Sequence, residues 1–240
     1  MLARDNIPQW LREVMNRGFK ATRTYRDFDH ALFAYINPGS RIIKPIPNKK
    51  VFVLEGVPGA GKTAVLKHFR QDGNILTVKQ ILPAEPEFDQ AMPISFYFRS
   101  DELKTAKCLE SDRSLCLLDR YYTSTLAFYW ASDRLKRTAK YNQAVRWYHK
   151  SLGTGKIVKP FAVIYIDVPL ALSFSRKSRH SEKNFNNLWM NEKFLNYFKK
   201  YYDLFYAEIE PQTKIIRLSG QQPLADIIKE VKVLLYGRRK

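Results

Sequence analysis

The chain has 240 residues, of which 45% are hydrophobic, and a formal net charge of +18 at pH 7. This length and apolar content suit one α/β domain with an appendage and exclude a mainly disordered chain. No apolar run approaches the roughly 20 residues that cross a bilayer, and the first ten residues lack an apolar signal core. We therefore expect a cytoplasmic protein without a membrane span, in which Cys108 and Cys116 are reduced thiols with no assigned chemistry.

The positive charge has two explanations. A basic protein can bind nucleic acid through phosphate contacts, and a site for polyphosphate substrates also needs positive potential. The basic residues form clusters at residues 134–140, 176–179 and 238–240. Only the cluster at 176–179 falls where catalysis would need it. The other two are interpreted as solvated surface, with binding to nucleic acid or a membrane as the less favoured alternative.

The first expected elements form an N-terminal extension. Apolar residues with helical spacing at 10–15 and 25–36 predict two helices, and Asn37-Pro38-Gly39 ends the second. Residues 44–50 then have the composition of an extended linker. We therefore predict a helical extension at residues 1–49, to which the sequence assigns no function, and a main domain at residues 50–240.

The strongest motif is VFVLEGVPGAGKT at residues 51–63, in which an apolar strand candidate leads into Gly56, four further residues and Gly61-Lys62-Thr63. This is the P-loop pattern, and helical spacing follows it at residues 64–70. The glycines let successive backbone N–H groups converge on a phosphate at a helix N-terminus. Lys62 can then reach the terminal phosphates of ATP, while the Thr63 hydroxyl can bind Mg²⁺. The expected ATP-binding residues are Gly56, Val57, Pro58, Gly59, Ala60, Gly61, Lys62 and Thr63.

Candidate acceptor-binding residues follow a second expected strand at residues 74–78. Glu85 lies beyond that strand, at the edge where open parallel sheets bind ligands. A carboxylate there can orient a phosphate acceptor or accept its proton, and the alternative is an exposed loop glutamate. Residues 93–98 and 102–109 then predict a helix or a helix pair that lines the acceptor side.

A further apolar run, LCLLD at residues 115–119, ends in an acid and is followed by Arg120. In P-loop proteins an aspartate at this place holds Mg²⁺ or its water ligands, because the strand ends beside the phosphate-binding loop. Asp119 is therefore a candidate metal ligand, and a structural ion pair is the alternative.

Residues 119–128, DRYYTSTLAF, resemble the DRY-x-x-S-x-L-A-Y segment of thymidylate kinases, within the wider family of P-loop nucleoside and nucleotide kinases. Other segments follow in the same order as in that family. Residues 159–169 are similar to its KPDL-x-IYLDV strand, and ALSFSRKSR at 171–179 is similar to its arginine-bearing helix and lid. The resemblance covers about residues 50–236 and leaves the extension outside it.

The resemblance implies a role for each matching residue. Lys62 would stabilise charge on the transferred phosphoryl group, Asp119 would bind metal or position the acceptor, and Arg120 would hold the acceptor's phosphate. Arg176 and Arg179 would close over ATP, although both could instead be ordinary exposed helix residues. The base pocket would be lined by Ser124, Thr125 and Phe128. Members of the family commonly dimerise, so a homodimer is a further expectation.

The chain departs from the family pattern on the acceptor side. Ala84-Glu85-Pro86-Glu87 stands where the family has Arg-Glu-Pro-Gly, and Phe128-Tyr129-Trp130 stands in place of Tyr-Gln-Gly. The family's base-contacting arginine falls near Glu102, with Arg99 as a substitute out of register. Because polar groups in a pocket discriminate strongly among bases, these changes predict an altered or lost preference for thymidylate.

Five strand candidates, at residues 51–55, 74–78, 115–119, 162–167 and 214–218, alternate with helical segments. This predicts an α/β protein of the three-layer P-loop type, with a parallel five-stranded sheet, helices on both faces and all loop sites on one edge. The leading function is phosphoryl transfer from ATP, with Mg²⁺, to a nucleoside monophosphate, with dTMP as the expected acceptor and dTDP as the product. Two alternatives stay open. One is a kinase for a nucleoside or another small hydroxyl compound with Glu85 as base, and the other is an ATP-binding regulatory protein that engages nucleic acid or a protein partner.

Overall fold

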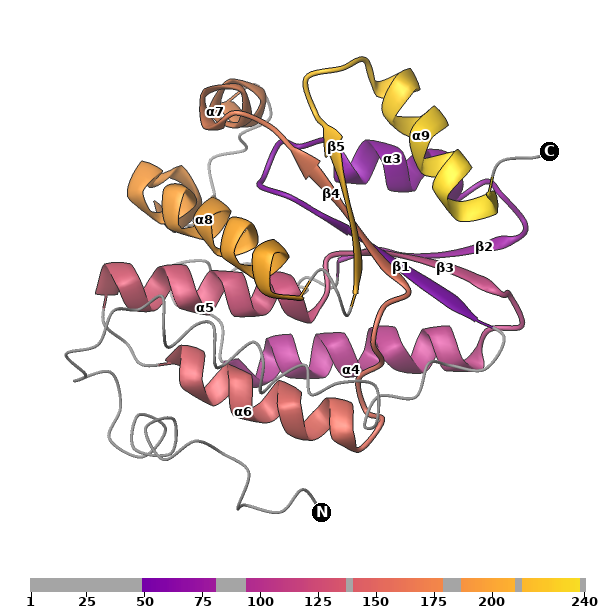
Figure 1. Ribbon diagram of the computed structural model, residues 1–240, viewed down its shortest axis with the longest axis horizontal. Coiled ribbons are helices and arrows are strands. Elements are labelled where there is room, and N and C mark those ends of the chain that lie inside the picture. The colour runs from indigo at the N-terminus through magenta and orange to yellow at the C-terminus, as the bar shows by residue number, and fades with distance from the viewer. Residues whose placement is uncertain (1–48, 81–93, 137–139, 179–186, 210–212, 238–240) are drawn as a thin grey trace.

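The structure is a computed structural model that describes residues 49–80, 94–136, 140–178, 187–209 and 213–237 (Figure 1). Apart from Lys49, the expected helical extension at residues 1–49 lies outside the described residues, so the division of the chain at residue 50 stays a prediction.

Five strands form one parallel sheet in the order β2-β3-β1-β4-β5. The central strand β1 pairs with β3 on one side and with β4 on the other, and all but the first residue of β1 are buried. A parallel strand covered on both faces has a continuous apolar sequence, which is why the strands could be recognised. Their bounds, each within one residue of the prediction, are Lys50–Glu55 (β1), Ile75–Val78 (β2), Leu115–Asp119 (β3), Ala162–Asp167 (β4) and Lys214–Ser219 (β5).

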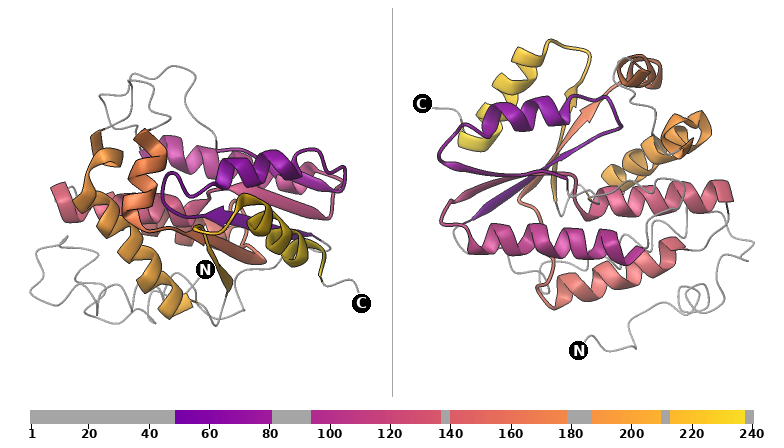
Figure 2. Two further views of the ribbon diagram at one scale, coloured as in Figure 1. Left: turned by 90° about the horizontal axis from the view of Figure 1, so that it is seen from above. Right: turned by 180° about the vertical axis from the view of Figure 1, so that it is seen from behind.

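Helices cover both faces of the sheet, which confirms the predicted three-layer fold. Helices α3 and α9 lie on one face, and α4, α5, α6 and α8 lie on the other (Figure 1; seen from behind in Figure 2). Within the described part of the chain, no helix is long and apolar enough to cross a membrane. The helix bounds are Lys62–Phe69 (α3), Ile94–Glu110 (α4), Tyr122–Lys136 (α5), Lys140–Gly153 (α6), Leu170–Ser178 (α7), Glu192–Ile209 (α8) and Leu224–Tyr236 (α9), with a short 3-10 helix, η2, at Asn187–Met190.

The segment expected to be a helix or a helix pair at residues 93–98 and 102–109 is one continuous helix, α4. No glycine or proline interrupts residues 94–110, so nothing in the local sequence ends the helix between the two stretches. Its inner face carries Phe98, Asp101, Thr105 and Cys108, all buried and spaced at three or four residues. This register decides which side chains of α4 face the candidate site.

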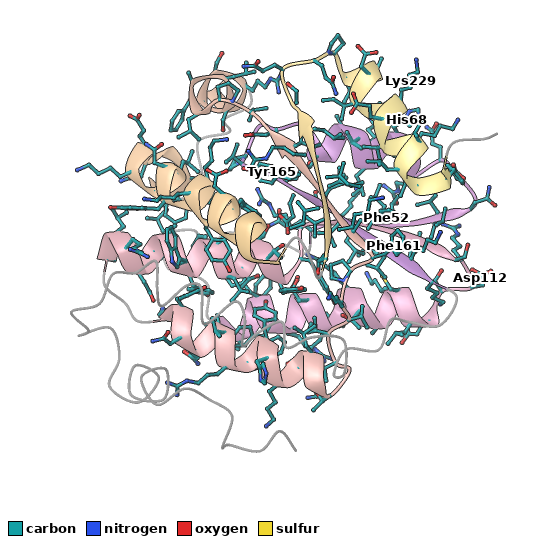
Figure 3. All side chains as sticks on the ribbon, viewed as in Figure 1. Phe52, His68, Asp112, Phe161, Tyr165 and Lys229 are labelled. Carbon is teal, nitrogen blue, oxygen red and sulfur yellow. The ribbon has the colours of Figure 1, made fainter. Side chains whose placement is uncertain are left out.

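Aromatic side chains fill the spaces between the layers (Figure 3). Phe52 on β1 meets Phe161 edge to face, with ring centroids 5.3 Å apart, and Tyr165 on β4 packs on Tyr202 of α8 at 4.8 Å. The second contact packs α8 against β4, which pairs with the strand that leads into the P-loop.

Candidate functional site

The P-loop connects β1 to α3 at the carboxyl edge of the sheet, as predicted. Gly56 has a φ of 138°, and a Cβ there would lie 2.4 Å from the carbonyl oxygen of Ile166 on β4. Only glycine therefore fits between the loop and the sheet. Gly61 forms the N-cap of α3 without any side-chain capping bond, so no side chain competes with an anion for the first N–H groups of the helix.

Lys62 is buried beneath this loop. Its ammonium donates to the carbonyl oxygens of Gly56 at 2.9 Å and Val57 at 3.0 Å. The pKa of Lys62 is lowered to about 7, first by burial and then by the neighbouring Arg120, and the carboxylates of Asp119 and Glu55 offset only part of these two effects. An anionic phosphate would add a further negative charge beside this ammonium.

The turn after β3 brings Asp119 and Arg120 to the same edge. Asp119 lies beside Leu54 in the sheet, and Arg120 has the left-handed φ of 58°, which is uncommon for a residue with a Cβ. The Arg120 N–H donates to Leu54 O at 3.0 Å, and the buried Lys104 ammonium donates to Asp119 O at 3.2 Å and to Arg120 O at 2.9 Å. A strained turn held by three hydrogen bonds is typical of a functional site.

Asp119 and Thr63 fit the magnesium ion that the motif implies. One carboxylate oxygen of Asp119, Oδ1, is buried and has no hydrogen-bond partner among the described residues, while Thr63 is exposed on the first turn of α3. The described part of the chain has no group of three or more His, Cys, Asp or Glu side chains that could hold a metal by themselves. A site with only one or two protein ligands is typical of Mg²⁺, because this ion keeps several water ligands and also binds the phosphates of the substrate.

A small cavity opens beside Arg120, between α4, α5 and η2. It has a volume of about 40 Å³, well below the roughly 300–1,000 Å³ of ligand pockets. Four of the expected acceptor-side residues come together in its wall: Arg120, Ser124, Thr125 and Phe128. The same wall contains Tyr97, Asp101, Lys104 and Trp189.

The guanidinium of Arg120 is held at the cavity by its neighbours. It donates from Nη1 to the Ser124 hydroxyl at 3.1 Å, and it lies 5.7 Å from the ring centroid of Trp189 and 5.8 Å from that of Phe198. Both distances fall within the range of cation–π contacts. Ser124, expected to line a base pocket, therefore also positions this arginine.

Arg99 does not occupy the place expected for it. Its side chain is 69% exposed and forms an ion pair of 3.3 Å with Glu102, which also pairs with Lys156 at 3.7 Å. Neither Arg99 nor Glu102 lines the cavity. The register of the continuous helix α4 turns Asp101 and Lys104 toward the cavity and Arg99 and Glu102 away from it. Contact between Arg99 and an acceptor stays a prediction.

Helix α7, which carries the expected lid arginine, packs on the P-loop. Ser173 donates to Pro58 O at 2.5 Å, and Arg176 Nη1 donates to Gly59 O at 3.3 Å. Arg176 is thus next to the loop that would hold phosphate. Arg179 and Glu85, the other lid arginine and the candidate base, lie outside the described residues.

Three charged residues that no sequence motif had singled out are buried at the site: Glu55, Asp101 and Lys104. The signal for Glu55 was present, since an acid ends the apolar run VFVLE immediately before the P-loop glycine. Asp101 and Lys104 gave no comparable signal, because charged residues in a helix are usually on its exposed face.

A larger hollow of about 650 Å³ runs along the edge of the sheet, and its lining includes Leu76, Lys79, Lys107 and Arg113. No P-loop residue is among those that line it. It is therefore separate from the candidate nucleotide site.

No protein-family model matches the chain. Solved structures of a deoxyadenosine kinase from M. mycoides are similar in fold. The one with bound dCTP has a TM-score of 0.60 and 18% sequence identity, over 77% of this chain and 98% of that one. The one with bound dATP has a TM-score of 0.57 and 17% identity over the same shares. At this identity the likeness establishes the architecture, a three-layer α/β P-loop fold.

Proposed function

We propose that this chain is a kinase that transfers the γ-phosphoryl group of ATP, in the presence of Mg²⁺, to a nucleoside-type acceptor. The observation that carries the proposal is the location of two buried cations at the same edge of the sheet: the Lys62 ammonium donates to carbonyl oxygens of the P-loop, and the Arg120 guanidinium lines the cavity beside it. The carboxylates of Asp119 and Glu55 offset only part of the effect of burial and of Arg120 on Lys62, so an anion that binds near both cations is further stabilised. Phosphoryl transfer requires positioned positive charge of this kind rather than covalent help from the protein.

The acceptor that we favour is a deoxynucleoside. Two observations support this choice over the monophosphate expected from the sequence. Arg99, the substitute for the base-contacting arginine of thymidylate kinases, faces solvent, which removes one reason to expect thymidylate as the acceptor. The structural neighbours are described as deoxyadenosine kinase, in one case with the products dCMP and dCDP bound. Nucleoside monophosphates, with dTMP among them, are the second candidate, because the Arg120 guanidinium lines the cavity where an acceptor phosphate would need a cation.

The reaction forms one bond and breaks one. The acceptor oxygen forms a bond to the γ-phosphorus, the bond from that phosphorus to the β,γ-bridging oxygen breaks, and ADP leaves. The hydroxyl proton passes to a base, for which Glu85 is our candidate. Lys62, Arg120 and Arg176 would neutralise charge on the transferred group, and Mg²⁺ held by Thr63 and Asp119 would supply further positive charge to the phosphates of ATP.

Acceptor binding requires the cavity to widen. Its volume of about 40 Å³ has room for only a few water molecules, each of which needs about 10–15 Å³ on this measure. The bulky Tyr129 and Trp130 are not in the cavity wall; they pack in the core against Tyr97 and Tyr197. Widening therefore needs movement of wall residues such as Tyr97 and Trp189, which are only partly buried against the core.

A screen of acceptors tests the proposal. The full-length protein is incubated with ATP and Mg²⁺ and with each deoxynucleoside and deoxynucleoside monophosphate in turn, and ADP and the phosphorylated product are quantified. We expect one deoxynucleoside to be phosphorylated far faster than ATP is hydrolysed without acceptor, and Lys62→Ala to abolish this activity. A preference for dTMP would establish the second candidate. Equal ATP consumption with every acceptor and with water would overturn both. The cytoplasmic location and the homodimer stay predictions.

A further inference from the structure

The hollow of about 650 Å³ runs along the outer edge of β2, between the end of α3 and the last turn of α4. Its volume falls within the roughly 300–1,000 Å³ of ligand pockets. Strand β2 stands at the end of the sheet order, so its outer edge pairs with no strand among the described residues. The hollow is therefore large enough for a ligand and lies beside an unpaired strand edge.

The charge of the hollow favours an anionic ligand. Its lining contains four basic side chains and only two acidic ones, Glu110 and Asp112. Within the ranges that the structure describes, neither Arg70 nor Lys79 takes part in an ion pair. Arg113 is held in place, because its Nη1 donates to Ile75 O at 2.7 Å, while its other guanidinium N–H groups can bind a ligand. The basic side chains are Arg70 at the end of α3, Lys79 after β2, Lys107 on α4 and Arg113 before β3.

The hollow adjoins the acceptor cavity. Gln80, which is half-buried just after β2, lines both of them. The sheet order explains this arrangement: β1 leads into the P-loop, its neighbour β3 leads into Arg120 at the cavity, and the next strand, β2, leads into Lys79 and Gln80. Adjacent strands are about 4.8 Å apart. The P-loop, the cavity and the hollow therefore follow one another along the carboxyl edge of the sheet.

The cavity and the hollow differ in the side chains that they offer. The cavity has the aromatic rings of Tyr97, Phe128 and Trp189, whereas none of the described residues that line the hollow is aromatic. A single-stranded nucleic acid matches both regions, because its bases stack on aromatic rings and its phosphates need cations. An acidic peptide would supply negative charge to the hollow but no base to the cavity.

We propose that the hollow binds the phosphate backbone of a single-stranded nucleic acid whose terminal nucleoside enters the cavity as the phosphoryl acceptor. The acceptor role rests on the proposed kinase function, and it makes the substrate class an oligonucleotide with a free 5′-hydroxyl. A chain that continues from the 3′ oxygen into the hollow leaves this hydroxyl toward the P-loop. The 5′ oxygen then forms the bond to the γ-phosphorus, the bond from that phosphorus to the β,γ-bridging oxygen breaks, ADP leaves, and the hydroxyl proton passes to the base.

Binding is tested without ATP, with the full-length protein and a short single-stranded deoxyoligonucleotide that has a 5′-hydroxyl and a 3′ fluorescent label. Fluorescence anisotropy gives the affinity at a series of salt concentrations. For a single strand, the logarithm of the affinity falls with the logarithm of the salt concentration by about 0.7 per phosphate neutralised. The double variant Arg70→Gln with Lys79→Gln changes two exposed side chains, so it should stay folded. Its salt slope should be smaller than that of wild type by about 1.4.

The matched control is the double variant Lys229→Gln with Lys232→Gln, which removes the same charge from exposed positions on α9 (Lys229 in Figure 3). Its salt slope should equal that of wild type. Equal losses in the two double variants would mean that binding reflects the overall charge of the protein, and the assignment of the hollow would be wrong. Displacement of the oligonucleotide by a glutamate peptide of the same charge and concentration would also overturn it, because the site would then not distinguish nucleic acid from an acidic peptide.

The acceptor role is tested with ATP and Mg²⁺, by comparing the same oligonucleotide, unlabelled, with free deoxynucleosides. We expect kcat/KM to be higher for the oligonucleotide, and the variant with Arg70→Gln and Lys79→Gln to lower this value while kcat/KM for the deoxynucleoside stays unchanged. Phosphorylation of a deoxynucleoside but not of the oligonucleotide would overturn the acceptor role and leave the kinase function intact. Oligonucleotide binding that this variant weakens, without phosphorylation of any acceptor, would support the hollow as a nucleic-acid site and overturn only the kinase function.

Discussion

Lys104 and Asp101, one turn apart on α4, form an ion pair of 3.6 Å in which each side chain is only 3% exposed. Burial raises the pKa of Asp101, and the Lys104 ammonium and hydrogen bonds from Tyr148 and Thr125 oppose this rise. The same ammonium donates to the carbonyl oxygens of Asp119 and Arg120. One lysine therefore neutralises a buried acid and holds the strained turn at the site.

Lys104→Met should destabilise the protein by about 3–5 kcal/mol, because it leaves the Asp101 carboxylate buried without its partner. Urea denaturation measures this loss. The double variant Asp101→Asn with Lys104→Met should recover part of it, since no charge is then left unpaired. The control Lys107→Met, on the exposed face of the same helix, should change stability by less than about 0.5 kcal/mol. Equal effects of Lys104→Met and Lys107→Met would contradict the importance of the pair.

Gly56→Ala should prevent the P-loop from closing against β4. Its Cβ would lie 2.4 Å from Ile166 O, at a φ that residues with a side chain rarely adopt. Backbone strain of this kind costs about 1–3 kcal/mol, so the unfolding free energy should drop by at least that amount and ATP affinity should fall with it. Gly73→Ala is the matched control, since a Cβ there meets nothing within 4 Å. Normal ATP affinity in Gly56→Ala would show that the close approach is not needed.

Much of the fold could be predicted from local patterns in the sequence. Each strand is a short apolar run, and the P-loop marks the point where β1 ends and α3 begins. Asp119 and Arg120 follow the strand that pairs with β1, so their position at the same edge follows from parallel topology. Four expected acceptor-side residues were therefore found at one cavity.

The remaining parts of the site depend on contacts between distant segments. Glu55 and Tyr202 are 147 residues apart in the chain, and only the packing of α8 on the sheet brings them together. The exposed position of Arg99 could not be read from the sequence, because the register of α4 decides which of its side chains line the cavity. Lys104 was missed because its pairing with Asp101, three residues earlier, resembles an ordinary pair on the exposed face of a helix, and its two other partners are backbone carbonyl groups, which leave no trace in the sequence.

Arg176→Ala should raise KM for ATP and lower kcat, if the contact of Arg176 with Gly59 O marks a position beside the bound phosphates. Loss of one preorganised cationic donor typically costs about 10²-fold in kcat. Lys229→Ala on the outer face of α9 removes an equal charge far from the P-loop (Figure 3) and should leave both constants unchanged. Steady-state kinetics with varied ATP measures both variants. If KM and kcat of Arg176→Ala equal those of wild type, Arg176 is an ordinary exposed helix residue with no role in ATP binding or transfer.

Asp119→Asn should weaken the dependence of the reaction on Mg²⁺, because it removes the carboxylate oxygen that is buried without a partner. We expect the Mg²⁺ concentration for half-maximal activity to rise about tenfold or more. Asp112→Asn, at an exposed residue before β3, is the control and should behave like wild type (Figure 3). Activity is measured at fixed ATP and increasing Mg²⁺. Identical Mg²⁺ curves for Asp119→Asn and wild type would favour a structural role for this acid.

The pKa of Lys62 predicts a pH dependence of both activity and stability. Only the protonated ammonium attracts phosphate, so kcat/KM for ATP should fall as the pH rises through about 7. The ordinary pKa of lysine is 10.5, so between these values the unfolded chain binds a proton that the folded protein lacks. The contribution of Lys62 to the free energy of unfolding therefore rises as the pH increases from about 7 to 10.5.

Lys62→Met tests this dependence, since its side chain has a similar length and does not titrate. It should abolish phosphoryl transfer and remain folded. Wild type should gain stability relative to the variant as the pH increases from about 7 toward 10.5, measured by urea denaturation at a series of pH values. A stability difference that is constant over this range would mean that Lys62 keeps an ordinary pKa in the folded protein, and the buried-cation basis of the site would then be wrong.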